Sequence, residues 1–161
     1  MKKLIIMKNL LLSILLLSTV SLFGQIENQN YKTMKLNAGI ITNNFSDTKQ
    51  FYSEILGFGI TFENEFYLLM HTPNHQAEIS FLKPQHPSQK PIFQPAFEGK
   101  GLYLTIEVAD VDTLYQKLLA QGVEIEIAIR DEVWGDRHFA VVDPNGIGID
   151  VVTYSRPEVD K

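Results

Sequence analysis

An approximate internal repeat limits the folds that this chain can adopt. Asp47-Thr48 begins ten positions before Gly57, and Asp112-Thr113 begins ten positions before Gly122, so the second copy lies 65 residues after the first. In both copies a strand-like segment precedes this stretch and further strand-like segments follow it. Such a repeat indicates duplication of one supersecondary unit, here strand–helix–strand–strand–strand. A chain of 161 residues is long enough for one domain built from two such units.

The first unit is predicted to occupy residues 36–83. Ser46 or Asp47 can cap its helix, and Gly57 can end it, because glycine takes up the positive φ of a helix C-terminus without strain. Its other segments are apolar or alternating and are bounded by turn residues, which is typical of strands. The predicted strands are 36–42, 59–63, 66–71 and 77–82, with a turn at Thr72-Pro73-Asn74-His75.

A connection at residues 84–101 holds four of the seven prolines and separates the two units. Each proline removes a backbone donor, so this stretch predicts a surface loop rather than a central strand or a helix. The second unit, residues 102–153, has a helix from Asp112 to Gly122. Its predicted strands are 102–108, 123–129, 137–142 and 147–153, and a tail at 154–161 follows.

The N-terminus has the pattern of an export signal. Lys2, Lys3 and Lys8 precede an apolar run at residues 10–23, which ends in Gly24-Gln25. This pattern predicts a signal peptide over residues 1–25, a polar lead over residues 26–35, and a periplasmic or secreted protein. The run is shorter than the roughly 20 residues of a membrane span, so a permanent anchor is the weaker alternative. Translation could begin at Met1 or at Met7.

Charge and cysteine content exclude some classes of function. Removal of residues 1–25 takes away three of the 14 basic residues and none of the 19 acidic ones, so the formal net charge changes from −5 to −8. An acidic surface repels phosphate backbones, and no basic cluster with interleaved aromatics is found, which argues against a nucleic-acid partner. The chain has no cysteine and therefore neither disulfides nor thiolate metal sites.

Several short motifs follow one another along the two units. The motifs are Phe51-Tyr52, Leu56-Gly57-Phe58, Glu107-Val108-Ala109-Asp110-Val111-Asp112, Gly122-Val123, Trp134-Gly135-Asp136-Arg137 and Asp143-Pro144-Asn145-Gly146. In their order and spacing, over residues 36–153, the chain resembles the vicinal oxygen chelate family of glyoxalases, bleomycin-resistance proteins and extradiol dioxygenases. On physical grounds the last motif is a tight turn between antiparallel strands. Phe51 and Tyr52 are expected to pack a helix onto its sheet.

The resemblance implies an α+β fold in which paired βαβββ modules form a curled, cup-shaped sheet that holds a metal or a small organic ligand. Family metal enzymes place one His, Glu or Gln on each of four strands, and these positions fall on Asn37, Glu78, Tyr103 and Asp150. An amide and a phenol are poor ligands for a divalent ion. We therefore predict no metal cofactor, with a weak divalent site at Glu78 and Asp150 as the alternative.

Alternation along residues 102–108 predicts a two-faced strand. Tyr103, Thr105 and Glu107 share a polar face, and the intervening residues form an apolar one. The polar face is expected to line a ligand cavity, although a solvated or dimer-facing surface is the alternative. Trp134, near the mouth of the cup, either stacks on a flat cationic guest or simply packs. The predicted ligand-binding residues are Asn37, Glu78, Tyr103, Thr105, Trp134 and Asp150.

The histidines do not suggest a metal site. His71 and His75 bracket a turn, and His86 lies among prolines, so all three are expected to be solvated. His138 should point to the opposite face from Arg137 and is expected to have a structural role.

Our leading hypothesis is an exported homodimer that binds a small organic molecule without a catalytic metal. The alternatives are a metal-dependent lyase, epimerase or dioxygenase of the same family, and a non-catalytic interaction module whose cup is closed by side chains. Whether the chain is an enzyme is left open by the sequence.

Overall fold

The computed structural model describes residues 34–154, and those from Asn37 onward belong to one compact unit. The predicted export signal, most of the polar lead and nearly all of the C-terminal tail lie outside the described residues. Between residues 34 and 154, no helix is long and apolar enough to cross a membrane.

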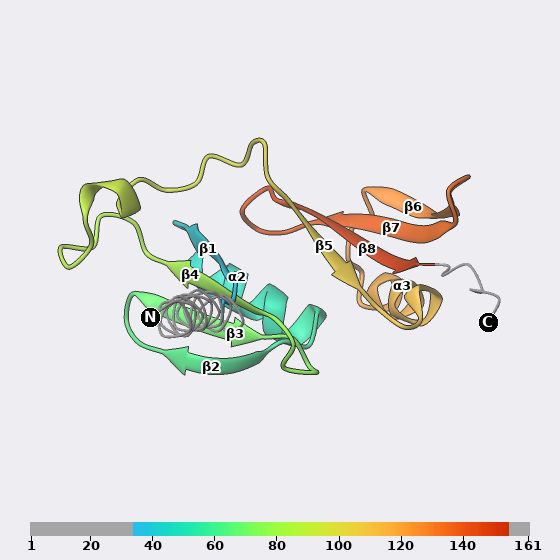
Figure 1. The fold of residues 1–161 in the computed structure, drawn as a ribbon, viewed down its shortest axis with the longest axis horizontal. Coiled ribbons are helices and arrows are strands. Elements are labelled where there is room, and N and C mark those ends of the chain that lie inside the picture. The colour runs from blue at the N-terminus through green and yellow to red at the C-terminus, as the bar shows by residue number, and fades with distance from the viewer. Residues whose placement is uncertain (1–33, 155–161) are drawn as a thin grey trace, which may run out of the picture. The chain divides into compact units, whose positions relative to one another are not determined.

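Two βαβββ modules with the same topology make up the fold (Figure 1). The first consists of β1 (Ala38–Ile41), α2 (Phe45–Gln50), the π-helix η1 (Phe51–Ile55), β2 (Gly59–Glu63), β3 (Tyr67–His71) and β4 (Glu78–Leu82). The second consists of β5 (Tyr103–Glu107), α3 (Val111–Ala120), β6 (Ile127–Asp131), β7 (Asp136–Val142) and β8 (Gly148–Tyr154). The strand orders are β1-β4-β3-β2 and β5-β8-β7-β6, and the first pair in each sheet is parallel. The predicted duplication and fold class are confirmed.

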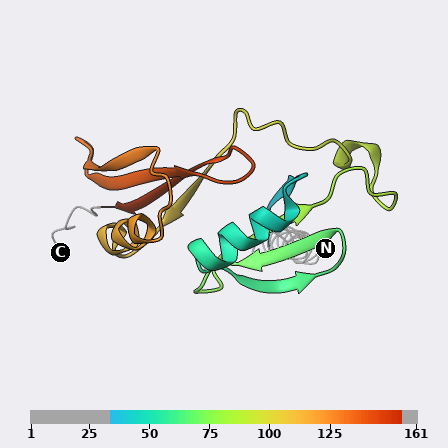
Figure 2. The same cartoon turned by 180° about the vertical axis from the view of Figure 1, so that it is seen from behind.

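The helix of the first module lies across one face of its own sheet (Figure 2). Tyr52 is fully buried there, with its ring centroid 4.8 Å from that of Phe81 and 5.5 Å from that of Phe58. Leu68 and Met70, at alternate positions of β3, are buried on the same side. The expectation that this helix packs onto the sheet is therefore confirmed, and the opposite face of the sheet is left for other contacts.

The predicted cap of this helix is wrong. The helix begins at Phe45, so Ser46 and Asp47 lie in its first turn, and Asn44 occupies the capping position without a side-chain capping bond. The amide of Asn44 donates instead to the backbone oxygen of Pro144, at 2.6 Å. Gly57 ends the helical segment at φ +77°, as predicted.

The sixth strand also differs from the prediction. It covers Ile127–Asp131 rather than residues 123–129, because Val123 still donates its backbone N–H to Leu118, at 3.0 Å, and closes the end of α3. Val123 and Ile125 pack against the core as loop residues, which explains the strand-like pattern that misled the prediction. The connection at residues 84–101 is a loop apart from one short 3₁₀ helix, η2 (Pro91–Phe93).

The turn between β7 and β8 joins the second module to the first. Asp143 is 4% exposed, and one of its carboxylate oxygens accepts the backbone N–H groups of Asn145 and Ile147, at 2.8 and 2.9 Å. The other oxygen accepts the hydroxyl of Tyr52, at 3.2 Å, and the amide of Asn145, at 2.9 Å. Burial, followed by the nearby charge and hydrogen bond of Asp143, raises the pKa of Tyr52.

Asn145 extends this contact to two buried threonines of the first module. Its side-chain oxygen accepts the hydroxyl of Thr42, which lies just beyond β1, and its amide nitrogen donates to the hydroxyl of Thr48 on α2, at 3.1 Å. The sequence predicted only a chain reversal for this turn. In the structure the turn is also the polar connection between the modules.

Replacing Tyr52 by Phe should lower the free energy of unfolding by about 1–2 kcal/mol, because the buried carboxylate of Asp143 loses a donor. Tyr115→Phe is the matched control, since the Tyr115 hydroxyl bonds to no described residue, and it should change stability by less than about 0.5 kcal/mol. Urea unfolding followed by circular dichroism measures both. Equal losses in the two variants would contradict the assigned role of this hydroxyl.

Candidate functional site

The face of the first sheet opposite α2 carries two of the predicted site residues. The amide of Asn37 donates to one carboxylate oxygen of Glu78, at 3.4 Å, and the hydroxyl of Thr61 donates to the other, at 3.4 Å. In the parallel pairing of β1 with β4, Gly39 lies opposite Ser80, two positions along from this pair, and therefore on the same face. The structure thus brings Asn37 and Glu78 together, as the family resemblance implies.

A cavity of about 370 Å³ lies over this face. Its floor is formed by Gly39 and Ile41 of β1 with Ser80 and Leu82 of β4, and Gln89 and Phe93 of the proline-rich connection complete its lining. A second cavity of about 200 Å³ also borders Gly39 and Ile41 and is lined by Pro95, Phe97 and Leu102. A Cβ on Gly39 would lie 3.2 Å from the Ser80 hydroxyl, so glycine keeps the floor open.

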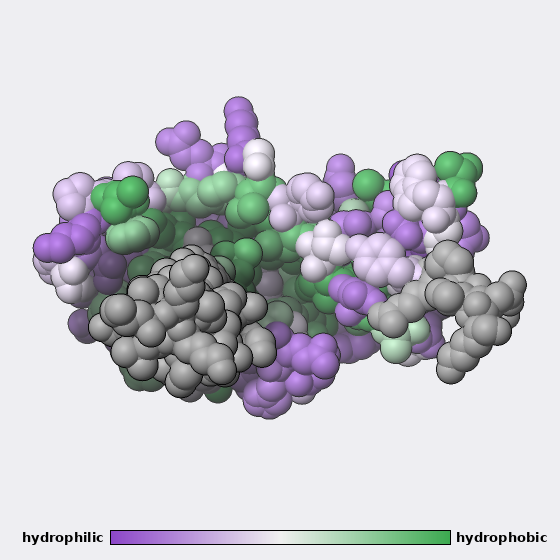
Figure 3. Space-filling view, viewed as in Figure 1, coloured by the Kyte–Doolittle hydropathy of each residue, from purple (hydrophilic) through white to green (hydrophobic). Residues whose placement is uncertain are grey.

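The proline-rich connection therefore contributes residues that sequence reasoning missed. Apolar residues lie along it in the space-filling view, and Ile92 and Phe93 are 79% and 53% exposed (Figure 3). A segment without periodic structure gives no signal for the direction of its side chains. Only its placement above β1 and β4 identifies Gln89 and Phe93 as part of the site.

The second sheet carries three other predicted residues. Thr105 of β5 lies opposite Asp150 of β8 in the parallel register, and Tyr103, two positions earlier, is 71% exposed. Leu104 and Ile106 are half-buried against the core, which confirms that β5 has one polar and one apolar face. Because Asn37 and Glu78 belong to the other sheet, the predicted residues form two groups on two sheets.

His138 joins the polar group of the second sheet. Its Nδ1 lies 2.6 Å from Asp150 and its Nε2 lies 3.0 Å from Glu132, which also contacts Arg130 at 2.6 Å. A neutral imidazole has one N–H and can donate in only one of these contacts, so the arrangement favours the protonated ring. The hydrogen bond to Asp150 is the main cause of the raised pKa of His138, and the bond to Glu132 adds to it.

The sequence assigned His138 a structural role and did not include Glu132. Alternation along β7 predicted that His138 and Arg137 point to opposite faces, and the two side chains do have different partners. The partners of His138 could not be inferred, because Glu132 lies in the turn after β6, whose position was predicted incorrectly.

Trp134 lies in the turn between β6 and β7. Its indole N–H donates to Asp136, at 2.7 Å, and the side chain is 66% exposed, so most of the ring is not packed against residues 34–154. His71, His75 and His86 each make a ring contact, and His75 is exposed, as predicted. His71 stacks on His75, with centroids 3.6 Å apart, and His86 is half-buried because it stacks on Phe66, with centroids 3.7 Å apart.

The four positions at which the family resemblance implies metal ligands offer few donors to a divalent ion. Asn37 and Glu78 are bonded to each other, Asp150 is bonded to His138, and Tyr103 is a phenol. Among residues 34–154, no group of three or more His, Asp or Glu side chains could hold a metal ion. This set does not fit the several anionic or imidazole donors that such an ion requires. That the protein works without a metal stays a prediction.

The paired histidine predicts a pH dependence. Because the pKa of His138 is raised in the folded state, its pairs should stabilise the fold fully below the unfolded pKa, near about 6.5, and this contribution should be lost as the pH rises through the folded pKa. NMR titration should give His138 a pKa above the ordinary value, and Asp150→Asn should lower it. A pKa unchanged by Asp150→Asn would contradict the assigned pairing.

Comparison with known proteins identifies the family. The model of the "Glyoxalase/Bleomycin resistance protein/Dioxygenase superfamily" matches residues 35–151. An uncharacterized protein of Mycobacterium bovis is 33% identical over 63 residues, which are 39% of this chain and 41% of that protein. The match thus spans about two fifths of the length of this curated relative.

Solved structures share the fold. A bleomycin-binding protein complexed with bleomycin has a TM-score of 0.56 and 21% identity, over 76% of this chain and all of that chain. Lactoylglutathione lyase from Agrobacterium tumefaciens has a TM-score of 0.61 and 15% identity, over 75% of this chain and 93% of that chain. Since the family model spans most of the sequence, this chain belongs to the glyoxalase/bleomycin resistance protein/dioxygenase superfamily.

Proposed function

We propose that this chain is an exported protein that binds a small organic molecule and does so without a catalytic metal. The observation that carries the proposal is the cavity of about 370 Å³ over Gly39 and Ser80. This volume lies within the range of about 300–1,000 Å³ that is usual for small-molecule sites. A bleomycin-binding protein with the same fold supports the proposal, because it binds an organic guest.

The lining of the cavity favours a particular kind of guest. Leu82, Ile41 and Phe93 offer apolar and aromatic surface, whereas Ser80 and Gln89 offer hydrogen bonds. Glu78 begins β4, two positions before Ser80 on the same face, and places a carboxylate just beyond the lining residues at that end. Apolar walls with a carboxylate at one end suit a flat aromatic cation, which gains both dispersion and charge-assisted contacts.

We also propose that the protein is a homodimer. The polar face of the second sheet is open in the single chain, where Tyr103 is 71% exposed and Val142 is 44% exposed. A second copy that covers these residues would place the Tyr103, Thr105 and Asp150 side chains in a shared cup. Trp134 would then lie at the mouth of that cup.

The binding proposal predicts that proflavine, a flat aromatic cation, binds saturably in a fluorescence titration. Glu78→Gln should weaken binding about tenfold, because a charge-assisted contact contributes about 1.5 kcal/mol. Glu124→Gln is the matched control, since it removes one exposed carboxylate from outside the cavity. Addition of chelator or Zn²⁺ should leave the affinity unchanged. Non-saturable binding contradicts the proposed site, and binding that requires metal contradicts the metal-free mechanism.

The export proposal predicts that cells producing the full chain release it, or hold it in the periplasm, without roughly its first 25 residues. Intact-mass spectrometry of the extracellular and periplasmic fractions measures the processed mass. Leu16→Arg, in the centre of the apolar run, should retain uncleaved protein in the cytoplasm. Uncleaved wild-type protein found only in the cytoplasm would overturn the proposal.

A further inference from the structure

A third cavity, also of about 370 Å³, lies between the two modules on the side of their helices. It shares no lining residue with the cavities over Gly39. Its walls come from the residues after η1, the turn between β3 and β4, the end of β5 and the start of α3. The lining residues are Leu56, Phe58, Thr72, Pro73, Asn74, Ile106, Glu107, Val108, Ala109 and Leu114.

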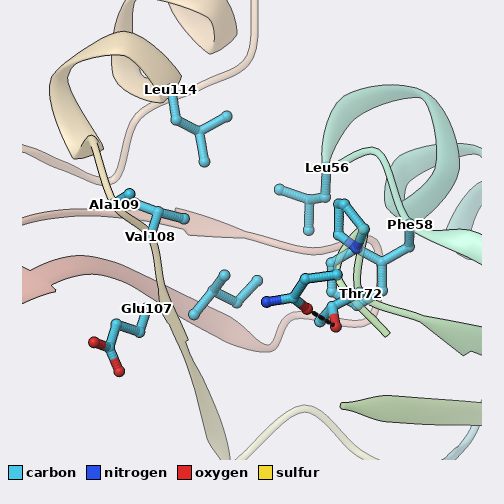
Figure 4. Close-up of a pocket in the computed structure, with 10 residues that line it drawn as sticks. Leu56, Phe58, Thr72, Glu107, Val108, Ala109 and Leu114 are labelled. Atoms are coloured by element: carbon cyan, nitrogen blue, oxygen red, sulfur yellow. Dashed lines mark hydrogen bonds between the residues drawn. The ribbon is translucent and has the colours of Figure 1, made fainter. Parts of the chain in front are cut away.

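Most of this wall is hydrocarbon. Leu56 is 9% exposed, and Ile106, Val108 and Leu114 are half-buried members of the surrounding core. In the close-up, Leu56 of the first module and Leu114 of the second face each other across the cavity (Figure 4). Water in such a space finds few hydrogen-bonding partners, so an apolar molecule that replaces it gains free energy.

Glu107 is the one lining residue with a charged side chain, and its carboxylate points away from Leu56 and Leu114 (Figure 4). This direction follows from alternation, because Ile106 and Val108 turn to the apolar face of β5 while Glu107 turns to the polar face. The cavity therefore offers no charge to a guest, and an uncharged molecule suits it best.

Asn74 supplies one directed polar group. Its side-chain oxygen accepts the hydroxyl of Thr72, at 2.7 Å (dashed line at Thr72 in Figure 4), and the backbone N–H of Gln76, at 3.2 Å. These two bonds fix the amide, while its nitrogen donates to no described residue. The amide nitrogen is thus a positioned donor at the edge of an otherwise apolar cavity.

The walls are held in place by contacts between the modules. Lys117 of α3 donates to the backbone oxygen of Ile55, at 3.2 Å, beside the cavity. Leu56 directly follows the π-helix η1. The π-helix is a rare form of helix, and where it occurs it is often at a functional site. The buried bonds of Asp143 and Asn145 add a second connection between the same two modules. The cavity is therefore part of the folded structure rather than a gap that a ligand must open.

We propose that this cavity between the modules binds a small uncharged molecule with an apolar body and one hydrogen-bond acceptor, such as an aromatic ketone. The apolar body lies between Leu56 and Leu114, and the ketone oxygen accepts the free N–H of Asn74. This site is separate from the cavity of the proposed function and does not depend on it.

Benzophenone tests the proposal directly, because it is an uncharged aromatic ketone that attaches covalently to neighbouring C–H groups when irradiated. The full-length protein is irradiated at increasing benzophenone concentrations, and the labelled peptides are identified by mass spectrometry. Labelling should saturate, and the label should lie within residues 54–58 or 104–115.

Two pairs of variants distinguish binding in this cavity from nonspecific labelling of the protein surface. Asn74→Asp keeps an acceptor for Thr72 and Gln76 but removes the donor, so half-maximal labelling should need about three- to tenfold more benzophenone. Asn64→Asp is its control, because Asn64 accepts two backbone N–H groups in the same manner outside the cavity. Ala109→Trp fills the mouth of the cavity at an exposed position and should abolish saturable labelling, whereas Leu119→Trp, exposed on α3 outside the lining, should not.

Each outcome of this experiment decides the matter. Labelling that rises linearly and is scattered over the surface overturns the proposal, as does saturable labelling that Ala109→Trp leaves intact. Saturable labelling of peptides that contain Gly39 or Phe93 also overturns it, since the ketone then occupies the cavity of the proposed function. If proflavine does not bind but saturable labelling near Leu114 is observed, the proposed function is contradicted and this second site is still supported.

Discussion

The two-module arrangement depends on the hydrogen bonds that the buried carboxylate of Asp143 accepts. A carboxylate that leaves water loses much solvation free energy unless donors surround it. Two backbone N–H groups of its own turn, the amide of Asn145 and the hydroxyl of Tyr52 provide those donors. Since Tyr52 belongs to the first module, Asp143 is fully satisfied only when the turn of the second module is seated against the first.

Two of the three cavities depend on that seating. The smaller cavity over β1 includes Leu102, which immediately precedes β5, and the cavity between the modules has Leu56 on one wall and Leu114 on the other. A shift of one module would change the spacing of these walls directly. The polar turn thus sets distances between residues that it does not touch.

Local signals predicted the fold well where one residue type has one physical role. Gly57 and Gly122 end helices at positive φ, as only glycine does without strain, and the duplicated order of elements predicted the paired modules. The prediction failed where a residue forms a hydrogen bond with a partner far away in the sequence. Asn44 replaces Ser46 and Asp47 at the start of the helix while its amide reaches Pro144, a contact across 100 positions that no local pattern contains.

The candidate site illustrates the same limit and bears on the prediction that no metal is bound. Alternation placed Tyr103 and Thr105 on one face, and the family resemblance added Asp150, but only the structure pairs Glu78 with the amide of Asn37 and Asp150 with His138. In each pair a neutral or cationic donor stands beside a carboxylate at a position where the family's metal enzymes hold an ion. Hydrogen-bond donors thereby offset the negative charge that an ion would otherwise neutralise, which is the balance that the proposed metal-free binding site requires.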